Sequence, residues 1–136
     1  MKYLVLSREK AKEYCNHINE PTAIISITFH GRTFPKFVEN ENIKDILYER
    51  FDDVSGGHDG CMELWQASEI CDFVNEVKDK VNLLIVHCDA GQSRSAGVCA
   101  AIMKYLEGDD SPIFNNPKFT PNSHCYNLVL GELMCC

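Results

Sequence analysis

The sequence predicts an α/β fold, in which a central, mostly parallel sheet of about four to five strands is flanked by helices. Two observations lead to this prediction. Short apolar runs rich in β-branched residues, typical of buried strands, alternate along the chain with longer segments of helical periodicity. In addition, 136 residues is the usual length of one domain, so residues 1–136 are expected to form a single unit.

The first two strands and the helix between them are predicted from the opening of the chain. Tyr3 to Ser7 and Ala23 to Thr28 are short and apolar, which indicates buried strands. Arg8 to Asn19 has charged and apolar residues at helical spacing, and Glu20-Pro21 is predicted to end this helix. The opening apolar run is too short for a signal sequence, so we interpret it as the first strand.

A third strand is predicted between two irregular segments. His30 to Asn42 contains glycine, proline and several polar residues and is expected to be a long surface loop. Ile46 to Phe51 is the strand candidate, and Asp52 to Gly60, with three glycines, is predicted to be irregular. Parallel sheets bind ligands at the carboxyl ends of their strands, so this last loop is expected to border the site.

Three helices are predicted in the second half of the chain. The first runs from Met62 or Glu63 to Asp79, the second covers Ser95 to Leu106, and the third covers Asn122 to Met134 after Thr120-Pro121. Ser111 to Phe119 is expected to be a loop. The apolar face of the first of these helices consists of Leu64, Ala67, Ile70, Cys71, Val74 and Val77.

The segment that carries the chemistry lies between a buried strand and a helix. The strand Leu83 to His87 leads into the sequence His87-Cys88-Asp89-Ala90-Gly91-Gln92-Ser93-Arg94-Ser95. A loop that enters a helix N-terminus points several backbone N–H groups at one spot and adds the positive end of the helix dipole, so phosphate or sulfate would bind there. The same dipoles and Arg94 would stabilise the nucleophilic thiolate of Cys88.

The two residues at the end of this segment fit a phosphoryl group. Arg94 has a planar fork of donors that can hold two phosphoryl oxygens at once. Ser95 would hydrogen-bond the Cys88 thiolate and help it to leave. The alternative is that Cys88 is a buried core cysteine at a strand end.

His87-Cys88, five intervening residues and then Arg94-Ser95 resemble the signature loop of the cysteine-dependent protein tyrosine phosphatase superfamily, and the short chain resembles its dual-specificity branch. The resemblance implies a phosphoryl-cysteine intermediate on Cys88, with neither metal nor cofactor. It implies that the substrate phosphate is held by Arg94 and the amides of the loop. The loop consists of Asp89, Ala90, Gly91, Gln92, Ser93 and Arg94.

The resemblance also implies two supporting residues. His87 would tune Cys88 through hydrogen bonds, although a core histidine at a strand end is the alternative. Thr120-Pro121-Asn122 resembles the Ser-Pro-Asn element that opens the last helix of dual-specificity phosphatases. Asn122 would brace the signature loop, although a simple helix N-cap would have the same sequence.

A general acid is expected near the leaving oxygen, because such proton donors accelerate displacement at phosphorus by about a hundred- to ten-thousand-fold. Phe51-Asp52-Asp53 lies about 35 residues before Cys88 and resembles the general-acid loop of the superfamily. The resemblance puts the acid at Asp53, and Asp52 is the alternative. Either residue could instead be a turn former at the end of a strand.

Composition restricts the substrate and the partners. The net charge is −7, which argues against a nucleic-acid or anionic-membrane surface. No Lys or Arg lies between Cys88 and Arg94, so a phosphomonoester on a protein, phosphotyrosine first, is expected rather than a polyphosphorylated inositol lipid. Phosphoserine and phosphothreonine stay open, because the depth of the pocket decides between them. Phosphate, sulfate or vanadate are the expected loop ligands.

Other functions remain as alternatives. A phosphate-binding or phosphoprotein-binding module without turnover would keep the loop and lack the chemistry. A sulfurtransferase or an RNA 5′-triphosphatase also uses a cysteine in an anion-binding loop, but the acidic chain disfavours the latter. The eight cysteines show no paired zinc-type spacing, and several lie in predicted helices, so the reducing cytoplasm is expected rather than a disulfide scaffold. The chain is expected to be a monomer.

Overall fold

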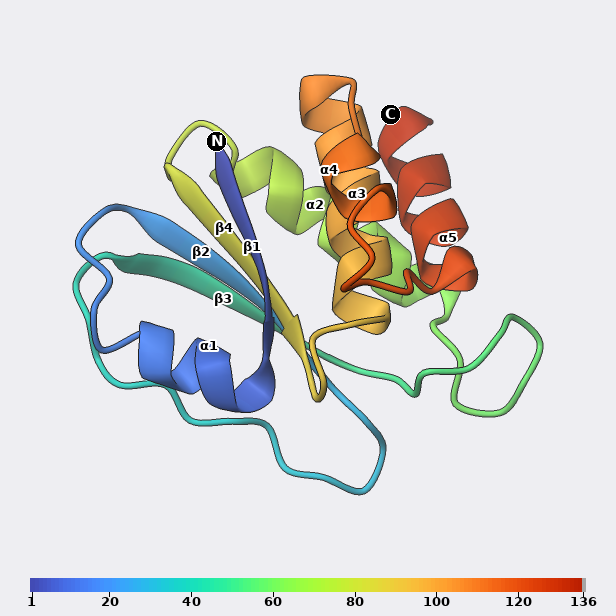
Figure 1. Cartoon of the computed structure of the whole chain (residues 1–136), viewed down its shortest axis with the longest axis horizontal. Coiled ribbons are helices and arrows are strands. Elements are labelled where there is room, and N and C mark those ends of the chain that lie inside the picture. The colour runs from blue at the N-terminus through green and yellow to red at the C-terminus, as the bar shows by residue number, and fades with distance from the viewer. Residues whose placement is uncertain (136) are drawn as a thin grey trace.

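A four-stranded parallel sheet forms the centre of the computed structural model, which describes residues 1–135 (Figure 1). The spatial order of the strands is β1-β4-β2-β3, and all three neighbouring pairs are parallel. The predicted α/β class, with one parallel sheet flanked by helices, is therefore confirmed. The strands are β1 (Lys2–Ser7), β2 (Thr22–Thr28), β3 (Ile43–Arg50) and β4 (Leu83–Cys88).

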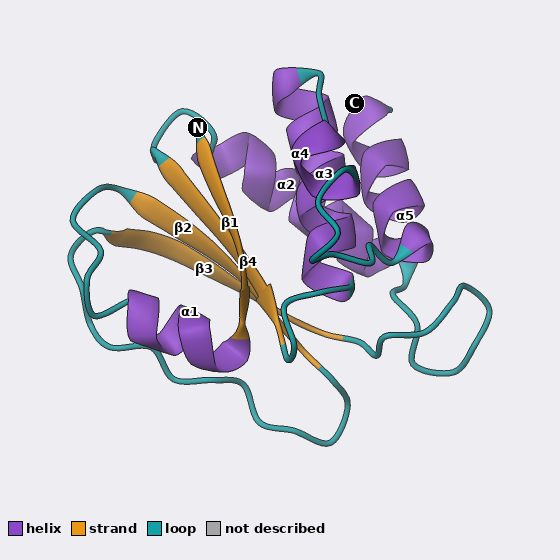
Figure 2. Ribbon diagram, in the orientation of Figure 1, coloured by secondary structure: helices purple, strands orange, loops and turns teal. Residues whose placement is uncertain are grey.

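Successive side chains of each strand point to opposite faces of the sheet, and each face packs against its own helices. Helix α1 (Arg8–Tyr14) lies on one face, where Ala11 and Cys15 pack with Ile24 of β2 and Ile85 of β4. Three longer helices lie on the opposite side of the sheet, which carries the larger part of the core, and the last of them packs against the other two (Figure 2). These helices are α2 (Leu64–Val77), α3 (Arg94–Glu107) and α5 (Ser123–Met134).

Helix α3, which follows the signature loop, is the central helix of this layer. Its small residues allow close packing against the chain that leads into α5. An added Cβ at Gly97 would lie 2.5 Å from the carbonyl oxygen of Asn122, so this position has room only for glycine. No helix among the described residues is both long and apolar enough to cross a membrane.

Three sequence predictions for the elements need correction. Helix α1 ends at Tyr14 and does not reach Asn19, because the carbonyl groups of Cys15 and Ile18 accept hydrogen bonds from Asn40 Nδ2 instead of continuing a helix. Strand β3 begins at Ile43, earlier than predicted, because this residue pairs with Thr22. The segment predicted as a loop from residue 111 contains the short helix α4 (Ser111–Phe114).

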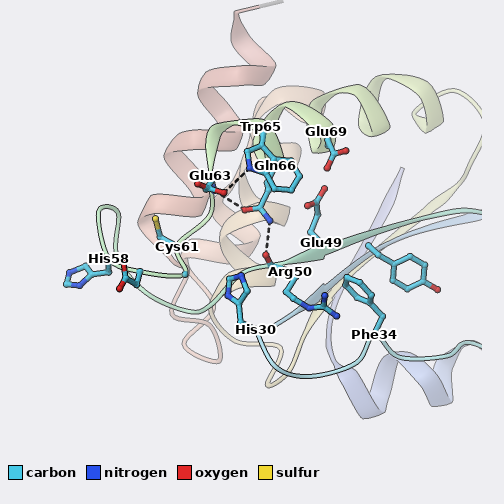
Figure 3. A pocket seen from close by; sticks show the side chains of 13 residues that line it. His30, Phe34, Glu49, Arg50, His58, Cys61, Glu63, Trp65, Gln66 and Glu69 are labelled. Carbon is cyan, nitrogen blue, oxygen red and sulfur yellow. Dashed lines mark hydrogen bonds between the residues drawn. The ribbon is translucent and has the colours of Figure 1, made fainter.

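Leu64 was predicted on the buried face of α2 and is instead 61% exposed. Leu64 is the first residue of α2, and this end of the helix lies outside the core. Gln66 takes a buried position in its place, and its Nε2 donates a 2.8 Å hydrogen bond to the carbonyl oxygen of Arg50 (Figure 3). The other five predicted face residues are buried: Ala67, Ile70, Cys71, Val74 and Val77.

Candidate active site

The loop between β4 and α3 is held from both sides by the backbone of neighbouring segments. Gly91 has a φ of +70°, and an added Cβ would lie 2.4 Å from the backbone nitrogen of Ser7, so only glycine fits. The backbone N–H of Arg8 donates to the carbonyl of Asp89, and that of Thr120 donates to the carbonyl of Gln92. These contacts fix the loop between the start of α1 and the segment before α5.

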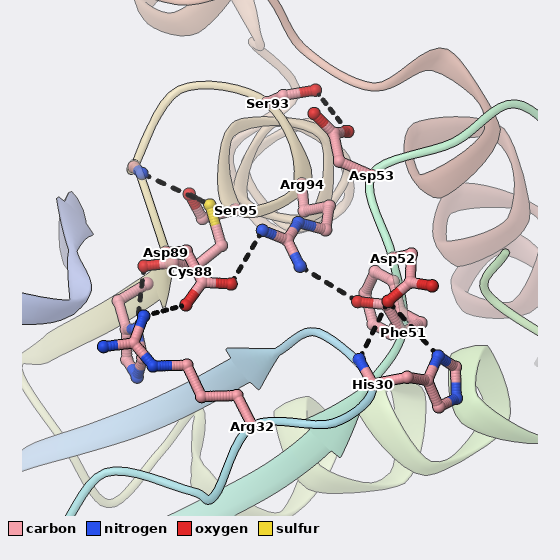
Figure 4. A network of polar contacts seen from close by, with 12 residues as sticks. His30, Arg32, Phe51, Asp52, Asp53, Cys88, Asp89, Ser93, Arg94 and Ser95 are labelled. Atoms are coloured by element: carbon pink, nitrogen blue, oxygen red, sulfur yellow. Dashed lines mark hydrogen bonds and ion pairs between the residues drawn. The ribbon is translucent and has the colours of Figure 1, made fainter. Parts of the chain in front are cut away.

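Cys88 ends β4 with its thiol facing polar groups. The residue is 1% exposed, and its Sγ lies 3.0 Å from Ser95 Oγ. The backbone N–H of Gly91 donates to the same sulfur at 3.3 Å (Figure 4). Sequence reasoning predicted the contact with Ser95, and the Gly91 N–H is a second polar partner of the sulfur.

Three other buried thiols have different surroundings. Burial raises the pKa of Cys15 to about 11 and that of Cys99 to about 12. Burial, followed by the nearby Asp53 carboxylate, raises the pKa of Cys125 to about 12. These thiols are therefore protonated at neutral pH, as core cysteines are. All three are free, as is Cys88.

Ser93 is the N-cap residue of α3, but its side chain does not cap the helix. Serine at this position ordinarily accepts a hydrogen bond from the first turn. Here Ser93 Oγ instead donates to Asp53 Oδ1 at 2.7 Å. The first amides of α3 are therefore left without this side-chain acceptor, which favours an anion at the helix N-terminus.

The Arg94 guanidinium is held in place by two hydrogen bonds. Nη1 donates to the carbonyl oxygen of Phe51, and Nη2 donates to Asp89 Oδ2, both at 3.0 Å. The Nε of this arginine is buried and has no hydrogen-bond partner among residues 1–135. An oriented guanidinium with a buried, unsatisfied donor is suited to an oxyanion.

Asp53 and Asn122 meet beside the signature loop, although 69 positions separate them in the sequence. Asn122 Nδ2 donates to Asp53 Oδ1 at 2.9 Å and to the carbonyl oxygen of Val54 at 3.1 Å. Asn122 Oδ1 also accepts from the backbone N–H of Cys125, so the residue caps α5 as well. The Asn122 side chain thus caps α5 and holds the segment of Asp53, while its backbone N–H donates to the carbonyl of Ser93.

Asp52 points to a different partner. Its Oδ1 accepts a hydrogen bond from the backbone N–H of His30 at 2.8 Å and lies 3.2 Å from His30 Nδ1 (Figure 4). The backbone hydrogen bond from His30 is the largest cause that lowers the pKa of Asp52 below its usual value. Asp52 is thus stabilised as a carboxylate chiefly by His30, whereas Asp53 is hydrogen-bonded to Ser93.

His87 is a neutral, fully buried residue behind Cys88. Burial lowers its pKa to about 4. Its Nδ1 lies 3.1 Å from the carbonyl oxygen of Cys88, which can only accept, so Nδ1 carries the proton. Nε2, 2.6 Å from Ser26 Oγ, therefore accepts from that hydroxyl. Both ring nitrogens of His87 thus have hydrogen-bond partners, one of them the backbone carbonyl of Cys88.

Sequence reasoning missed Arg32 and its neighbour Arg8. Arg32 Nη1 donates to Asp89 Oδ1 at 3.0 Å, across 57 positions of sequence. Arg8 is buried at the start of α1, where burial, followed by the nearby Arg32 charge, lowers its pKa. The loop itself contains no basic residue before Arg94, yet its surroundings supply two. No pattern in the sequence indicated these two residues, because Arg32 lies in a segment whose composition predicts only a surface loop.

Comparison with known proteins gives similarity at the level of structure alone. No protein-family model matches the sequence, and no curated protein matches it significantly. Human DUSP28 has a TM-score of 0.66 and 16% sequence identity, covering 98% of this chain and 92% of that chain. The Yvh1 phosphatase domain from Chaetomium thermophilum has a TM-score of 0.63 and 16% identity, covering 98% and 92% respectively.

A third similar structure is a mouse protein described as a dual-specificity phosphatase and complexed with zinc tungstate. Its TM-score is 0.62 at 18% identity, with 95% of this chain and 80% of that chain covered. The structural neighbours are thus cysteine-dependent phosphatases of the dual-specificity type. At these identities they show that this chain has the same fold over nearly its whole length.

Proposed function

We propose that this protein is a phosphomonoester hydrolase that acts through a cysteinyl-phosphate on Cys88. The observation that carries the proposal is the junction of β4 and α3. There a buried sulfur that accepts a backbone hydrogen bond lies in one loop with an oriented Arg94 whose Nε has no partner among the described residues. The fold of the phosphatases described above supports the same function.

The first step forms a bond between Cys88 Sγ and phosphorus and breaks the bond from phosphorus to the leaving oxygen. Arg94 and the amides at the start of α3 hold the equatorial oxygens, where negative charge is concentrated. Ser95 Oγ, 3.0 Å from the sulfur, stabilises the thiolate before attack and again when the sulfur leaves. The similar mouse protein forms a complex with zinc tungstate, and tungstate is an oxyanion, which supports oxyanion binding by this protein.

Asp53 is the proposed general acid. Its carboxyl group is bonded to Ser93 at the start of α3, so it borders the position of the bound phosphoryl group. Asp53 would donate a proton to the leaving oxygen and later accept one from the water that breaks the S–P bond. Asp52 is the poorer candidate, because its carboxyl group is hydrogen-bonded to His30 and not to the first residues of the loop-to-helix junction, as that of Asp53 is.

The proposed substrate is a phosphorylated protein side chain, with phosphotyrosine as the first candidate. Asp89 is the single charged side chain between Cys88 and Arg94, and a loop without basic residues of its own supports a substrate with one phosphate. The chain, residues 1–136, would act as one catalytic domain and as a monomer. A reducing compartment such as the cytoplasm suits a nucleophile that must stay a free thiol.

A phosphate-binding module without turnover is the second candidate. It is favoured by one observation: Asp53 Oδ1 already accepts hydrogen bonds from both Ser93 and Asn122. If these bonds persist when substrate binds, the acid cannot reach the leaving oxygen, and a bound phosphoprotein would stay intact.

The test compares hydrolysis of para-nitrophenyl phosphate and of phenyl phosphate across pH, with reductant and without added metal. We expect Cys88→Ser to abolish turnover of both substrates. Asp53→Asn should lower kcat by about a hundredfold or more for phenyl phosphate, whose leaving group needs a proton, and less for para-nitrophenyl phosphate. Asp52→Asn should lower both by less than about tenfold.

Each other outcome has a definite meaning. A larger loss in Asp52→Asn than in Asp53→Asn would move the acid to Asp52. No turnover by the wild type, together with phosphate binding that Arg94→Ala abolishes, would favour the binding module. Turnover retained by Cys88→Ser would contradict the cysteinyl-phosphate altogether.

A further inference from the structure

A pocket separate from the loop of Cys88 lies between β3, α2 and the segment that follows Asp52. Its volume is about 570 Å³, within the usual size of a ligand site (Figure 3). Four acidic residues line it, and aromatic residues form part of its wall. The acidic residues are Glu49, Asp59, Glu63 and Glu69, and the aromatic residues are Phe34, Tyr48 and Trp65.

Glu49 is the residue of this pocket that indicates a ligand. It is only 2% exposed, and its Oε2 is buried without a hydrogen-bond partner among residues 1–135. The carboxyl group of Glu69, on the facing helix α2, points toward it (Figure 3). Burial, followed by Glu69, raises the pKa of Glu49 to about 8. Without a cation, a proton held between Glu49 and Glu69 limits the repulsion of the two groups, and Glu49 Oε2 stays unsatisfied. A cation that enters between them would replace this proton and pair with both carboxylates.

The chain does not supply this cation itself. Arg50 lines the same pocket, but its Nη2 donates to the carbonyl oxygen of Arg32, and its guanidinium stacks over the Phe34 ring at 4.2 Å. Among residues 1–135, neither Glu49 nor Glu69 forms an ion pair with a basic side chain. The pocket is therefore an acidic site in which no internal cation meets the carboxylates.

The pocket adjoins the proposed catalytic site through consecutive residues at the end of β3. The carbonyl oxygen of Arg50 accepts from Gln66 in the wall of the pocket, and the next carbonyl oxygen, that of Phe51, accepts from Arg94. Successive Cα atoms are about 3.8 Å apart, so the two sites are neighbours. His30, which also lines the pocket, donates its backbone N–H to Asp52.

We propose that this pocket binds an Arg or Lys side chain of the protein substrate, a few residues from the phosphorylated residue, between the carboxyl groups of Glu49 and Glu69. The inference rests on the proposed function, because it assumes a phosphorylated peptide in the loop of Cys88. A guanidinium forms paired hydrogen bonds with carboxylates and stacks on aromatic rings. Trp65, 57% exposed and held by a hydrogen bond from its Nε1 to Glu63, offers such a ring.

The test measures binding of phosphotyrosine peptides to Cys88→Ser by fluorescence anisotropy. Each peptide carries one Arg, placed in turn at every position from about four residues before to about four after the phosphotyrosine, a span that an extended chain bridges. A second set carries citrulline, the neutral analogue of arginine, in the same place. We expect one position, or two with the same side-chain direction, at which Arg binds about tenfold more tightly than citrulline.

Three further variants locate the preference. In the Cys88→Ser background, Glu69→Gln and Glu49→Gln should each reduce the preference for Arg to less than about twofold. Glu76→Gln is the matched control: it removes the same charge from the same helix at a side chain that is 63% exposed and outside the pocket. Glu76→Gln should keep the preference. Circular dichroism of each variant checks that the fold is retained.

Two results would overturn the inference: no position at which Arg binds better than citrulline, or a preference that survives in both Glu49→Gln and Glu69→Gln. Failure of the proposed function has a different signature. With Cys88 intact, Glu49→Gln and Glu69→Gln should hydrolyse para-nitrophenyl phosphate as the wild type does. Absence of that turnover in the wild type would refute catalysis and leave the peptide-binding result to decide on the pocket.

Discussion

The Asp89 carboxylate lies between the guanidinium groups of Arg32 and Arg94, and it has two opposite effects on anion binding at the candidate site. Its Oδ1 accepts from Arg32 and its Oδ2 accepts from Arg94. The carboxylate therefore orients the guanidinium of Arg94, but it also places a negative charge in a loop proposed to bind anions. The orientation of Arg94 by Asp89 should raise the affinity for phosphate, whereas the negative charge of Asp89 should lower it. A substitution that keeps an oxygen acceptor but removes the charge distinguishes the two effects.

We expect Asp89→Asn to bind inorganic phosphate about fivefold more tightly, because removal of one charge at this range is worth about 1 kcal/mol. The amide oxygen of Asn can still accept from Arg94. Isothermal titration calorimetry on the Cys88→Ser background measures the affinity without turnover. Arg32→Ala is the counterpart, and it should weaken binding. Weaker binding in Asp89→Asn would mean that orientation of Arg94 outweighs repulsion.

At the scale of elements, the packing of α3 against the start of α5 links stability to the candidate site. Gly97 of α3 touches the backbone of Asn122, and Asn122 in turn bonds Asp53. Gly131 lies in α5, and no atom would lie within 4 Å of a Cβ added there. The two glycines thus differ in their surroundings, although both are in helices.

We predict opposite effects of alanine at these positions. Gly97→Ala should lower the free energy of unfolding by about 1–3 kcal/mol, because the new methyl group meets backbone that cannot turn away. Gly131→Ala should raise it by about 0.5–1 kcal/mol, because alanine favours a helix more than glycine does. Urea unfolding measures both. Gly97→Ala should also reduce kcat, since Asn122 holds Asp53; equal effects of the two substitutions would refute this account.

At the scale of the whole molecule, two buried titratable groups give stability opposite dependences on pH. The pKa of His87 falls from 6.5 to about 4 on folding, so its contribution is fully present above pH 6.5 and is lost as the pH falls toward 4. The pKa of Glu49 rises from 4.5 to about 8, so its contribution is fully present below pH 4.5 and is lost as the pH rises toward 8.

We therefore expect the free energy of unfolding to change little between pH 4.5 and 6.5, where the two slopes cancel, and to fall between pH 6.5 and 8. The fall should be about 2 kcal/mol, since one proton contributes about 1.4 kcal/mol per pH unit. Urea unfolding at a series of pH values measures it. Glu49→Gln should remove the fall above pH 6.5, whereas His87→Gln should not; a fall that persists in Glu49→Gln would contradict this assignment.

The sequence by itself predicted the α/β class, the four strands and every described helix except α4, and it identified the loop after β4 as the candidate site. These features are local: strand and helix periodicity, and a loop that enters a helix N-terminus, are encoded within short segments. Leu64 shows what helical periodicity cannot predict. Its position in the repeat indicates a buried side chain, but it is the first residue of α2, and this end of the helix extends past the core.

Only the tertiary structure decided which distant residues meet. The strand order β1-β4-β2-β3 brings the end of β3 near the signature loop, so that the carbonyl of Phe51 reaches Arg94. The same arrangement separates the surroundings of Asp52 from those of Asp53, and it places Glu49 opposite Glu69. Such contacts depend on how the strands pair and where each helix packs, and no local pattern carries that information.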